Sequence, residues 1–544
     1  MSQSQQTDRP TTGWVPMIFI GLGVALIIMD ATIVNVILPN IIFDLKINSI
    51  DAEWINAVYA LTFAAFLIVM GRLGDRFGRK SIFMWGALLF AVSSVAAAVS
   101  PNGTCLILAR ALQGIGGAMM SPTSLALVND LYRGKSRAIA FAMYGSIIGG
   151  MAAIGPLMGG WLTQAFSWHW SFWVNVPIAA LIAFGAWRFV PESRANDDVG
   201  SPDYVGALAS TIGTATLIFG LIEGRNYGWW KVSVPREFLG LTWSGISPVP
   251  VAIAISIISF VTLYLISKSR SRRGASVLID FDLFKIKTFG LGSFAGLIVS
   301  LGEFGILFSL PLFLQNVLGW STLGAGGLLA TLALGAFIAA PSAAVIANRK
   351  NPRFVARLGL VLEIIGIAGI GFVADPNVSG WSIGIWLLIY GLGVGYATAQ
   401  LTGLILADIP LKKSGQASGT QSTARQIGAA MGTAILGTIL FVSLQQKTYD
   451  NLVDINVPSD TAQSLAQSVE TSAGTIIPSL GQSSGIAVQT ASEMAFASAI
   501  QLTAFAAGLF VFLGLLATLA LPPGNPRQVT GEVDQTTLIQ SFEE

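Results

Sequence analysis

Long apolar segments recur along the whole chain, separated by shorter polar ones. Each apolar segment has about 20 residues or more, which is the length a helix needs to cross the hydrocarbon core of a bilayer. Helices are favoured because they satisfy their own backbone hydrogen bonds in lipid. The pattern predicts about fourteen transmembrane helices, at residues 14–38, 54–71, 81–99, 104–129, 137–162, 171–190, 203–222, 247–267, 286–316, 321–347, 354–373, 381–407, 416–443 and 494–521.

Two segments depart from this rhythm. Residues 444–493 are rich in Ser, Thr, Gln and Gly, and we expect a long extracellular loop that is either disordered or carries a short surface helix near Ala462–Glu470. The polar linker Arg194–Asp203 precedes two spans that look inserted between two six-helix halves. The predicted organisation is an all-α, polytopic membrane protein, divided into an N-terminal six-helix bundle, a linker with two inserted helices, and a C-terminal six-helix bundle: residues 1–193, 194–280 and 281–544.

Composition supports a membrane protein. Hydrophobic residues make up 53% of the chain and charged residues only 11%, against about 25% charged in soluble domains. The 60 glycines suit close helix packing, and the 14 tryptophans suit the membrane interfaces. The lipid bilayer is therefore an expected partner.

The distribution of positive charge predicts the orientation. If the N-terminus is cytoplasmic, inner segments hold twenty-one Lys and Arg residues and outer segments hold five. Cytoplasmic loops collect these residues, so we expect a cell-membrane protein with both termini cytoplasmic. Topology accounts for the basic loops, and no nucleic-acid partner is expected.

The chain lacks the residues of several catalytic and metal-binding sites. Cys105 is the only cysteine and His169 the only histidine, so cysteine clusters and histidine-pair zinc sites are excluded. No G-x-x-x-x-G-K-[ST] phosphate loop is present. We therefore predict neither an enzyme nor a metal site nor a cofactor, and any energy that the protein uses must come from a gradient or from a partner.

The segment Gly71–Lys80 holds four cations among ten residues. A charge cluster of this density does not fit inside the bilayer, so the segment is predicted to be a cytoplasmic loop between two spans. Its candidate gating residues are Gly71, Asp75, Arg76, Gly78 and Arg79.

Asp30 and Arg110 are charged residues within predicted spans. A carboxylate at the depth of Asp30 faces water, pairs with a cation or carries a proton, and could exchange that proton for a substrate. Arg110 cannot neutralise, so a facing carboxylate or carbonyl is expected. The alternatives are a structural acid near the outer face for Asp30 and a side chain that snorkels to the outer surface for Arg110.

The fifth span carries a series of small residues. These leave one helix face almost without side chains, and the proline within the series bends the helix. Such a helix can slide against a neighbour while excluding water, although ordinary small-residue packing explains the spacing equally well. The residues are Gly145, Gly149, Gly150, Gly155, Pro156, Gly159 and Gly160.

The predicted spans of the second half hold three charged residues well away from their ends. Glu303 is the better candidate for a cation or proton site, because Gly302 and Gly305 open the helix around it. Glu363 is expected to pair with a loop cation, and Arg425 to reach only the cytoplasmic edge.

Together these segments resemble the fourteen-helix drug:proton antiporter family of the major facilitator superfamily. The resemblance covers most of residues 14–443. It rests on Asp30 to Pro39, the 71–80 segment, the Arg110 segment, the span from Gly145 to Gly160, Leu314-Gln315 with Gly319 and Ser321, and Thr423 to Gly428. Departures are Gly74 in place of the usual Ala or Ser, His169 in place of the usual Arg, and a degraded second copy of the 71–80 pattern near Asn348–Arg353.

The resemblance implies the major facilitator fold and a monomeric, proton-coupled exporter of amphipathic, often cationic, small molecules. Asp30, Arg110 and Glu303 would line the central cavity. Asp75 with Arg76 would lock the cytoplasmic helix ends in the outward-facing state. Export of lipids, siderophores or small anionic metabolites on the same fold is the alternative, and a non-transporting membrane sensor is a third hypothesis.

Overall fold

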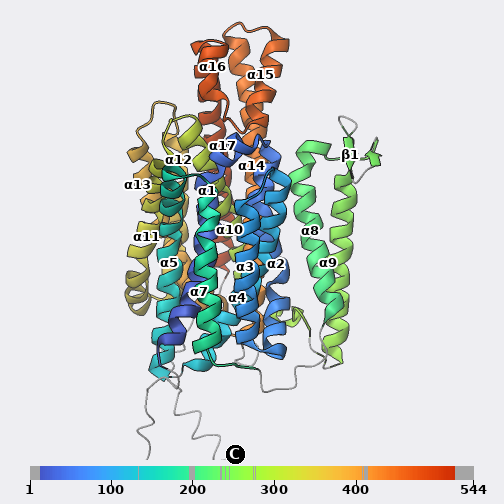
Figure 1. The fold of residues 1–544 in the computed structure, drawn as a ribbon, viewed down its shortest axis with the longest axis vertical. Coiled ribbons are helices and arrows are strands. Elements are labelled where there is room, and N and C mark those ends of the chain that lie inside the picture. Colours follow the sequence, from blue (N-terminus) through green and yellow to red (C-terminus); the bar gives the residue numbers. More distant parts are fainter. Residues whose placement is uncertain are drawn as a thin grey trace, which may run out of the picture.

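The computed structural model shows an all-α molecule made of long, roughly parallel helices (Figure 1). It describes residues 13–132, 134–194, 203–232, 236–238, 241–243, 245–273, 275, 277–406, 408–409 and 414–520.

The first part of the chain forms seven helices, of which the last two are separated only by residue 174 and together make one candidate span. They are α1 (Val15–Leu45), α2 (Ser49–Phe77), α3 (Arg79–Ala98), α4 (Gly103–Leu131), α5 (Gly134–Ala165), α6 (Trp170–Trp173) and α7 (Asn175–Phe189). The middle part comprises α8 (Tyr204–Tyr227), β1 (Arg236–Phe238), β2 (Leu241–Trp243), α9 (Pro248–Arg272) and the short 3-10 helix η1 (Phe281–Lys285). The last part comprises α10 (Lys287–Asn316), α11 (Thr322–Arg349), α12 (Pro352–Val373), α13 (Gly380–Leu406), α14 (Ser414–Asp454), α15 (Ser459–Thr471), α16 (Ile477–Ser483) and α17 (Ile486–Leu519).

Within the described residues, thirteen helical segments are long and apolar enough to cross a membrane. The helix α5, with 32 residues, adds a fourteenth of sufficient length. The predicted all-α, multi-pass architecture is confirmed. The two short strands form an antiparallel pair, and α9 packs against α8 and η1, so α8 and α9 stand as a hairpin beside the bundle (Figure 1). The three-part division at residues 193 and 280 stays a prediction.

The segment Gly71–Lys80 is not a loop. Its first seven residues are the last turns of α2, and α3 begins at Arg79. Gly78 alone joins the two helices, with a φ of 115° that favours glycine. Charged residues can continue a helix beyond the bilayer because the backbone hydrogen bonds are kept, and for this reason charge density was a poor guide to where α2 ends.

Residues 444–493 are also helical rather than irregular. The helix α14 continues to Asp454, α15 covers the predicted surface helix at 462–470, and α16 follows. Ala462, Ala466 and Val469 of α15 are buried, and Ala462 and Val469 belong to the main hydrophobic core, which stabilises a segment whose composition suggested disorder. We call α15 and α16 the cap, the end of the molecule that carries them the cap end, and the opposite end, with the α2–α3 junction, the basic end (Figure 1).

The two large parts of the chain touch closely at the cap end. The Gln315 side chain of α10 donates a hydrogen bond to the Val36 carbonyl of α1 at 2.8 Å. The Thr322 hydroxyl of α11 donates to Asn40 of α1 at 2.9 Å. The cap reaches across as well, since the hydroxyl of Ser49 in α2 lies 3.1 Å from a carboxylate oxygen of Glu470 in α15. These contacts close the cap end in this conformation.

Candidate functional site

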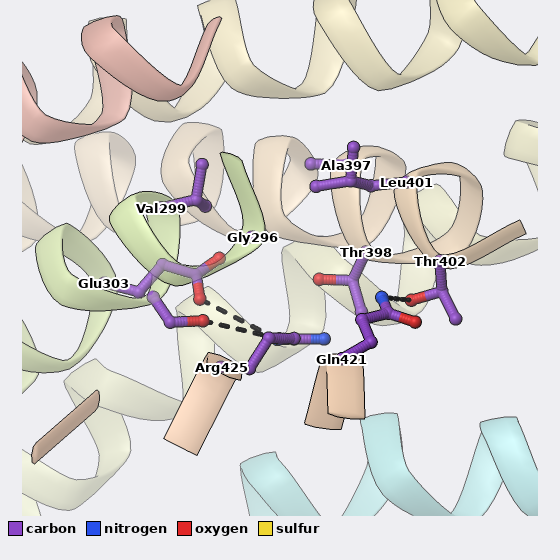
Figure 2. Close-up of a pocket in the computed structure, with 10 residues that line it drawn as sticks. Gly296, Val299, Glu303, Ala397, Thr398, Leu401, Thr402, Gln421 and Arg425 are labelled. Atoms are coloured by element: carbon purple, nitrogen blue, oxygen red, sulfur yellow. Dashed lines mark hydrogen bonds and ion pairs between the residues drawn. The ribbon is translucent and has the colours of Figure 1, made fainter. Parts of the chain in front are cut away.

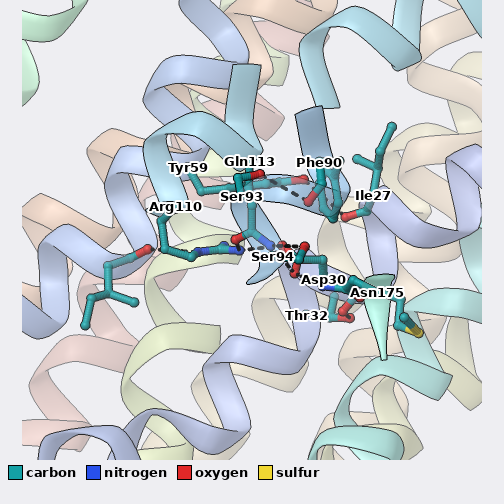
Figure 3. Close-up of polar contacts among 12 residues, drawn as sticks. Ile27, Asp30, Thr32, Tyr59, Phe90, Ser93, Ser94, Arg110, Gln113 and Asn175 are labelled. Atoms are coloured by element: carbon teal, nitrogen blue, oxygen red, sulfur yellow. Dashed lines mark hydrogen bonds and ion pairs between the residues drawn. The ribbon is translucent and has the colours of Figure 1, made fainter. Parts of the chain in front are cut away.

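A buried polar network joins α1, α4 and α7 in the middle of the first helix bundle (Figure 3). Asp30 forms an ion pair with Arg110, and both side chains are at most 1% exposed. One Asp30 carboxylate oxygen accepts hydrogen bonds from the amides of Asn175 at 2.7 Å and Gln113 at 3.2 Å. The Asp30 carboxylate is therefore neutralised by a cation and bonded by further donors.

The surroundings of Arg110 complete this network. Its guanidinium donates to Gln113 at 2.9 Å and to the Ile55 carbonyl at 3.4 Å, and it lies over the Tyr59 ring at 4.3 Å. The predicted facing carboxylate and carbonyl are both found, and the snorkelling alternative is wrong because the side chain points inward. Breaking such a buried pair by removing one partner costs about 3–5 kcal/mol, since the other charge is left unpaired.

A second charged cluster lies between α10, α13 and α14 (Figure 2). An oxygen of the Glu303 carboxylate is 3.9 Å from a terminal nitrogen of Arg425, and the Arg425 Nε donates to Ser300 at 3.3 Å. The expectation that Arg425 reaches only the edge of the membrane is therefore wrong. These residues line a cavity of about 10 Å³ together with Gly296, Val299, Ala397, Thr398, Leu401, Thr402 and Gln421. That volume admits roughly one water molecule.

Glu363 of α12 does not pair with a loop cation. Its side chain is fully buried, and neither carboxyl oxygen has a hydrogen-bond partner in the part of the chain that the structure describes. The helix position explains this, because Glu363 lies in the middle of α12 and faces α13 at Gly393, far along the helix from the basic end.

At the basic end, the candidate gating residues form an ion-pair cluster. Arg79 binds the carboxylate of Asp75, one turn earlier, at 2.8 Å and also pairs with Asp130 of α4. Arg76 instead lies over the ring of its neighbour Phe77, at 5.7 Å. The resemblance implied Asp75 with Arg76, whereas the described contact of Asp75 is to Arg79.

The two glycines at the ends of this cluster lie against other helices and the segment after α7. Gly71 packs against Pro122 of α4, where an added Cβ would lie 3.3 Å from the proline Cβ. A Cβ at Gly78 would lie 2.6 Å from the Glu192 carboxylate, which accepts hydrogen bonds from the Lys80 backbone amide and the Ser81 hydroxyl. The turn at Gly78 is thus enclosed by charged and polar groups.

The small residues of α5 pack against two different helices. A Cβ added at Gly159 would lie 3.2 Å from the Ile33 carbonyl of α1, and Gly155 likewise faces the α1 backbone at Met29. At Gly160 an added Cβ would lie 2.6 Å from the Leu323 Cα of α11, and the backbone of Pro156 faces α11 as well. The surroundings of Gly145, Gly149 and Gly150 fall outside the described residues.

Sequence reasoning missed several residues of these clusters. Gln113 and Asn175 were not recognised because buried amides carry no charge that stands out in an apolar segment. Glu53 of α2 is fully buried and packs against Gly437 of α14. The predicted second span began at residue 54, so this acid was assigned to a loop. An acidic residue within one turn of a span is the signal that could have identified it.

Membrane-spanning helices that surround buried charged networks define a multi-pass membrane transporter of small molecules and not an enzyme. The chain belongs to the Major Facilitator Superfamily, because the model of that family matches residues 20–433.

Comparison with known proteins agrees with this membership. The chain is 32% identical to the multidrug efflux pump LfrA of Mycolicibacterium smegmatis, over 93% of this chain and 95% of that protein. It is 27% identical to the tetracenomycin C resistance and export protein of Streptomyces glaucescens, over 90% of this chain and 87% of that protein. A bacterial homologue of the human lysosomal transporter Spinster, in an inward-facing and occupied conformation, has a similar fold, with a TM-score of 0.62, 16% identity and coverage of 94% of this chain and 97% of that one.

Proposed function

We propose that this protein is a proton-coupled antiporter of the cell membrane that exports amphipathic, often cationic, small molecules by alternating access, with both termini in the cytoplasm. The observation that carries the proposal is the buried Asp30–Arg110 network at the centre of the first bundle. The similarity to a multidrug efflux pump and to an antibiotic export protein supports the direction and the substrate class.

The geometry of the network offers a way to couple proton and substrate. A proton bound at Asp30 removes the charge that holds Arg110, so the guanidinium must turn to other acceptors on α2 and α4. Because Asp30 also holds Asn175, protonation loosens α1 from α4 and α7 together. Proton binding thereby changes helix contacts, which alternating access requires.

The charge balance favours cations. Among the described spans, Asp30 and Glu303 are buried acids that pair with Arg110 and Arg425, and Glu363 is a third buried acid. The excess of carboxyl groups over guanidinium groups in these three positions favours a cationic substrate over an anionic one. No cofactor is needed, since the proton gradient supplies the free energy, and we expect the monomer to be the working unit.

The test uses purified protein in liposomes with an imposed pH gradient and a fluorescent cationic dye. Wild-type protein is expected to accumulate dye only when the gradient is present, and Asp30→Asn to lose this accumulation, because asparagine keeps the size but cannot exchange a proton. Glu493→Gln, near the cap end of α17, is the matched control and should transport normally. Gradient-driven uptake at the wild-type rate in Asp30→Asn would refute a coupling role for Asp30.

Asp30→Asn also leaves the buried Arg110 without its carboxylate. The double variant Asp30→Asn/Arg110→Gln removes both charges and keeps hydrogen-bonding groups, so it should recover thermal stability without recovering gradient-driven transport. If wild-type protein moves lipids or anionic metabolites but no cationic dye, the substrate class proposed here is wrong.

A further inference from the structure

The fully buried Glu363 is an acidic group of the second bundle to which the mechanism above assigns no role. It lies in the middle of α12, and its Cγ would be 2.7 Å from a Cβ added at Gly393 of α13, so the absence of a side chain there makes room for it. Both of its carboxyl oxygens are without a hydrogen-bond partner among the described residues. The space around Glu363 therefore fits its side chain, but the described residues that form this space supply no hydrogen-bond donor to its carboxyl group.

Tyr390 of α13 connects this position to the Glu303–Arg425 pair of α10 and α14. Its hydroxyl is 3.4 Å from the Glu303 carbonyl, and its backbone packs against Gly366, one turn after Glu363 in α12. The helices α11, α13 and α17, which pack on α12, bring no other charged side chain to this depth among the described residues. The charged residue of α11 is Arg349 at its last position, α13 has none in its described range, and Glu493 of α17 lies near the cap end.

An ionised carboxylate in this position would be strongly unfavourable. Removing it from water without donors is so costly that a buried acid takes up a proton instead. Arg425 cannot fully compensate, because in this conformation it is engaged by Glu303 and Ser300. Asp30 differs in this respect, because its carboxylate accepts hydrogen bonds from Arg110, Gln113 and Asn175.

We propose that Glu363 is a second proton-binding site of the transporter, which carries its proton in the conformation closed at the cap end and releases it when Arg425 turns from Glu303 toward Glu363. This inference rests on the proposed proton-coupled function and adds a site in the second bundle.

Infrared spectroscopy of the purified wild-type protein tests the protonation directly. The carbonyl stretch of a protonated carboxylic acid should be present at neutral pH and be lost in Glu363→Gln, whereas Glu493→Gln keeps it. This result is expected whether or not transport is coupled to protons. An identical protonated-carboxyl band in wild type and Glu363→Gln would overturn the assignment.

Transport then tests the role of this proton. Glu363→Gln should lose gradient-driven dye accumulation and show less proton release on dye binding, while the exchange of dye across the membrane without a gradient continues. Glu363→Asp should restore part of the coupling, which a merely structural role of the side-chain length would not allow. Unchanged proton release in Glu363→Gln overturns the inference alone, whereas absence of proton release in wild type overturns the proposed function as well.

Folding of the variant is not expected to be a difficulty. Because Glu363 makes no hydrogen bonds to described residues, replacement by glutamine breaks none, and Glu363→Gln should be at least as thermally stable as Glu493→Gln in detergent. A large loss of stability in Glu363→Gln would show that the carboxyl group has an essential ionic partner and would overturn the proposal of a neutral acid.

Discussion

Arg79 occupies the first position of α3 and holds two carboxylates, Asp75 at the end of α2 and Asp130 near the end of α4. The cluster therefore ties three helices at the basic end. Its residues are 15–33% exposed, so each ion pair is worth little more than about 1 kcal/mol. A change of that size leaves folding intact but can shift the balance between two conformations about fivefold.

We expect Arg79→Gln and Asp75→Asn to reduce the turnover rate while changing the equilibrium affinity for the dye only slightly. Both residues lie at the basic end, away from the Asp30 and Glu303 clusters, so they act on the conformational balance rather than on bound substrate. Arg76→Gln is the matched control, because Arg76 contacts the Phe77 ring rather than a carboxylate, and it should have a smaller effect. Equilibrium binding and proton-driven flux are measured on the same preparation, and a loss of binding by orders of magnitude would place Asp75 in the substrate site.

Single residues were predictable where their chemistry left few options. An intramembrane arginine requires an acceptor, so the pairing of Arg110 with a carboxylate could be expected, and Asp30 was the deep acid of the first half. The partner of Arg425 was not predictable in the same way. Its distance from the helix end allowed either a surface or an interior position, and only the packing of α10 against α14 selects Glu303.

At the scale of the element, α5 acts as a contact surface between the two large parts of the chain. Gly155 and Gly159 face α1, whereas Gly160 faces the beginning of α11 at Thr322 and Leu323. The three described glycines of the predicted small-residue face thus contact two helices rather than one, and the sliding role of that face stays a prediction. Backbone atoms form the Gly160 contact, so neither helix can relieve a clash there by moving a side chain.

We expect Gly160→Ala to weaken closure of the cap end and to reduce transport. The added Cβ would lie 2.6 Å from Leu323 Cα and 2.7 Å from the Thr322 carbonyl, an overlap that typically costs 1–3 kcal/mol unless the helices separate. Gly327→Ala in α11 is the control, because nothing lies within 4 Å of the Cβ added there. Both variants replace a helical glycine by alanine and gain the same helix propensity, about 1 kcal/mol. Any difference in transport between them therefore reports the effect of the Gly160 contact with α11.

The measurement is the rate at which a thiol reagent labels a cysteine introduced at Asn40, in protein whose only native cysteine, Cys105, is replaced by serine. Asn40 contacts Thr322 at the closed cap end, so Gly160→Ala should raise its labelling rate while Gly327→Ala leaves it unchanged. Equal labelling rates in the two variants would mean that α5 and α11 do not close this end.

The number of membrane-spanning helices was predicted correctly, but the ends of several helices were not. The fourteen apolar segments all correspond to helices, because hydrophobic length reports directly on the bilayer. Beyond the bilayer this constraint ends. The extension of α2 to Phe77 and of α14 to Asp454, and the helical cap, depend on packing against other parts of the chain, which composition and hydropathy do not record.

At the scale of the whole molecule, the described conformation is closed at the cap end by contacts from three elements of the first bundle. The helix α1 binds α10 and α11 through hydrogen bonds, α5 packs against α11 through its glycines, and α2 meets α15 of the cap through Ser49 and Glu470. Alternating access requires all of these contacts to separate when the cap end opens. Of these contacts, the one between Ser49 and Glu470 joins the first bundle to the cap.

We therefore predict that a short bifunctional thiol reagent joining Ser49→Cys and Glu470→Cys, in the protein with Cys105→Ser, abolishes turnover but preserves dye binding. The two native side chains approach to 3.1 Å, so the reagent can bridge them in the closed state, and the link then prevents the cap end from opening.

The matched control is Asn451→Cys with Ala491→Cys, which joins α14 and α17 within the second bundle, where Asn451 donates to the Ala491 carbonyl at 3.0 Å. That link should leave turnover unchanged, because both helices belong to the same side of the interface. Cleavage of a reducible reagent should restore transport in the first pair. Full turnover in the linked Ser49–Glu470 pair would mean that the cap does not separate from α2 during transport, and that the opening at this end takes place between other helices.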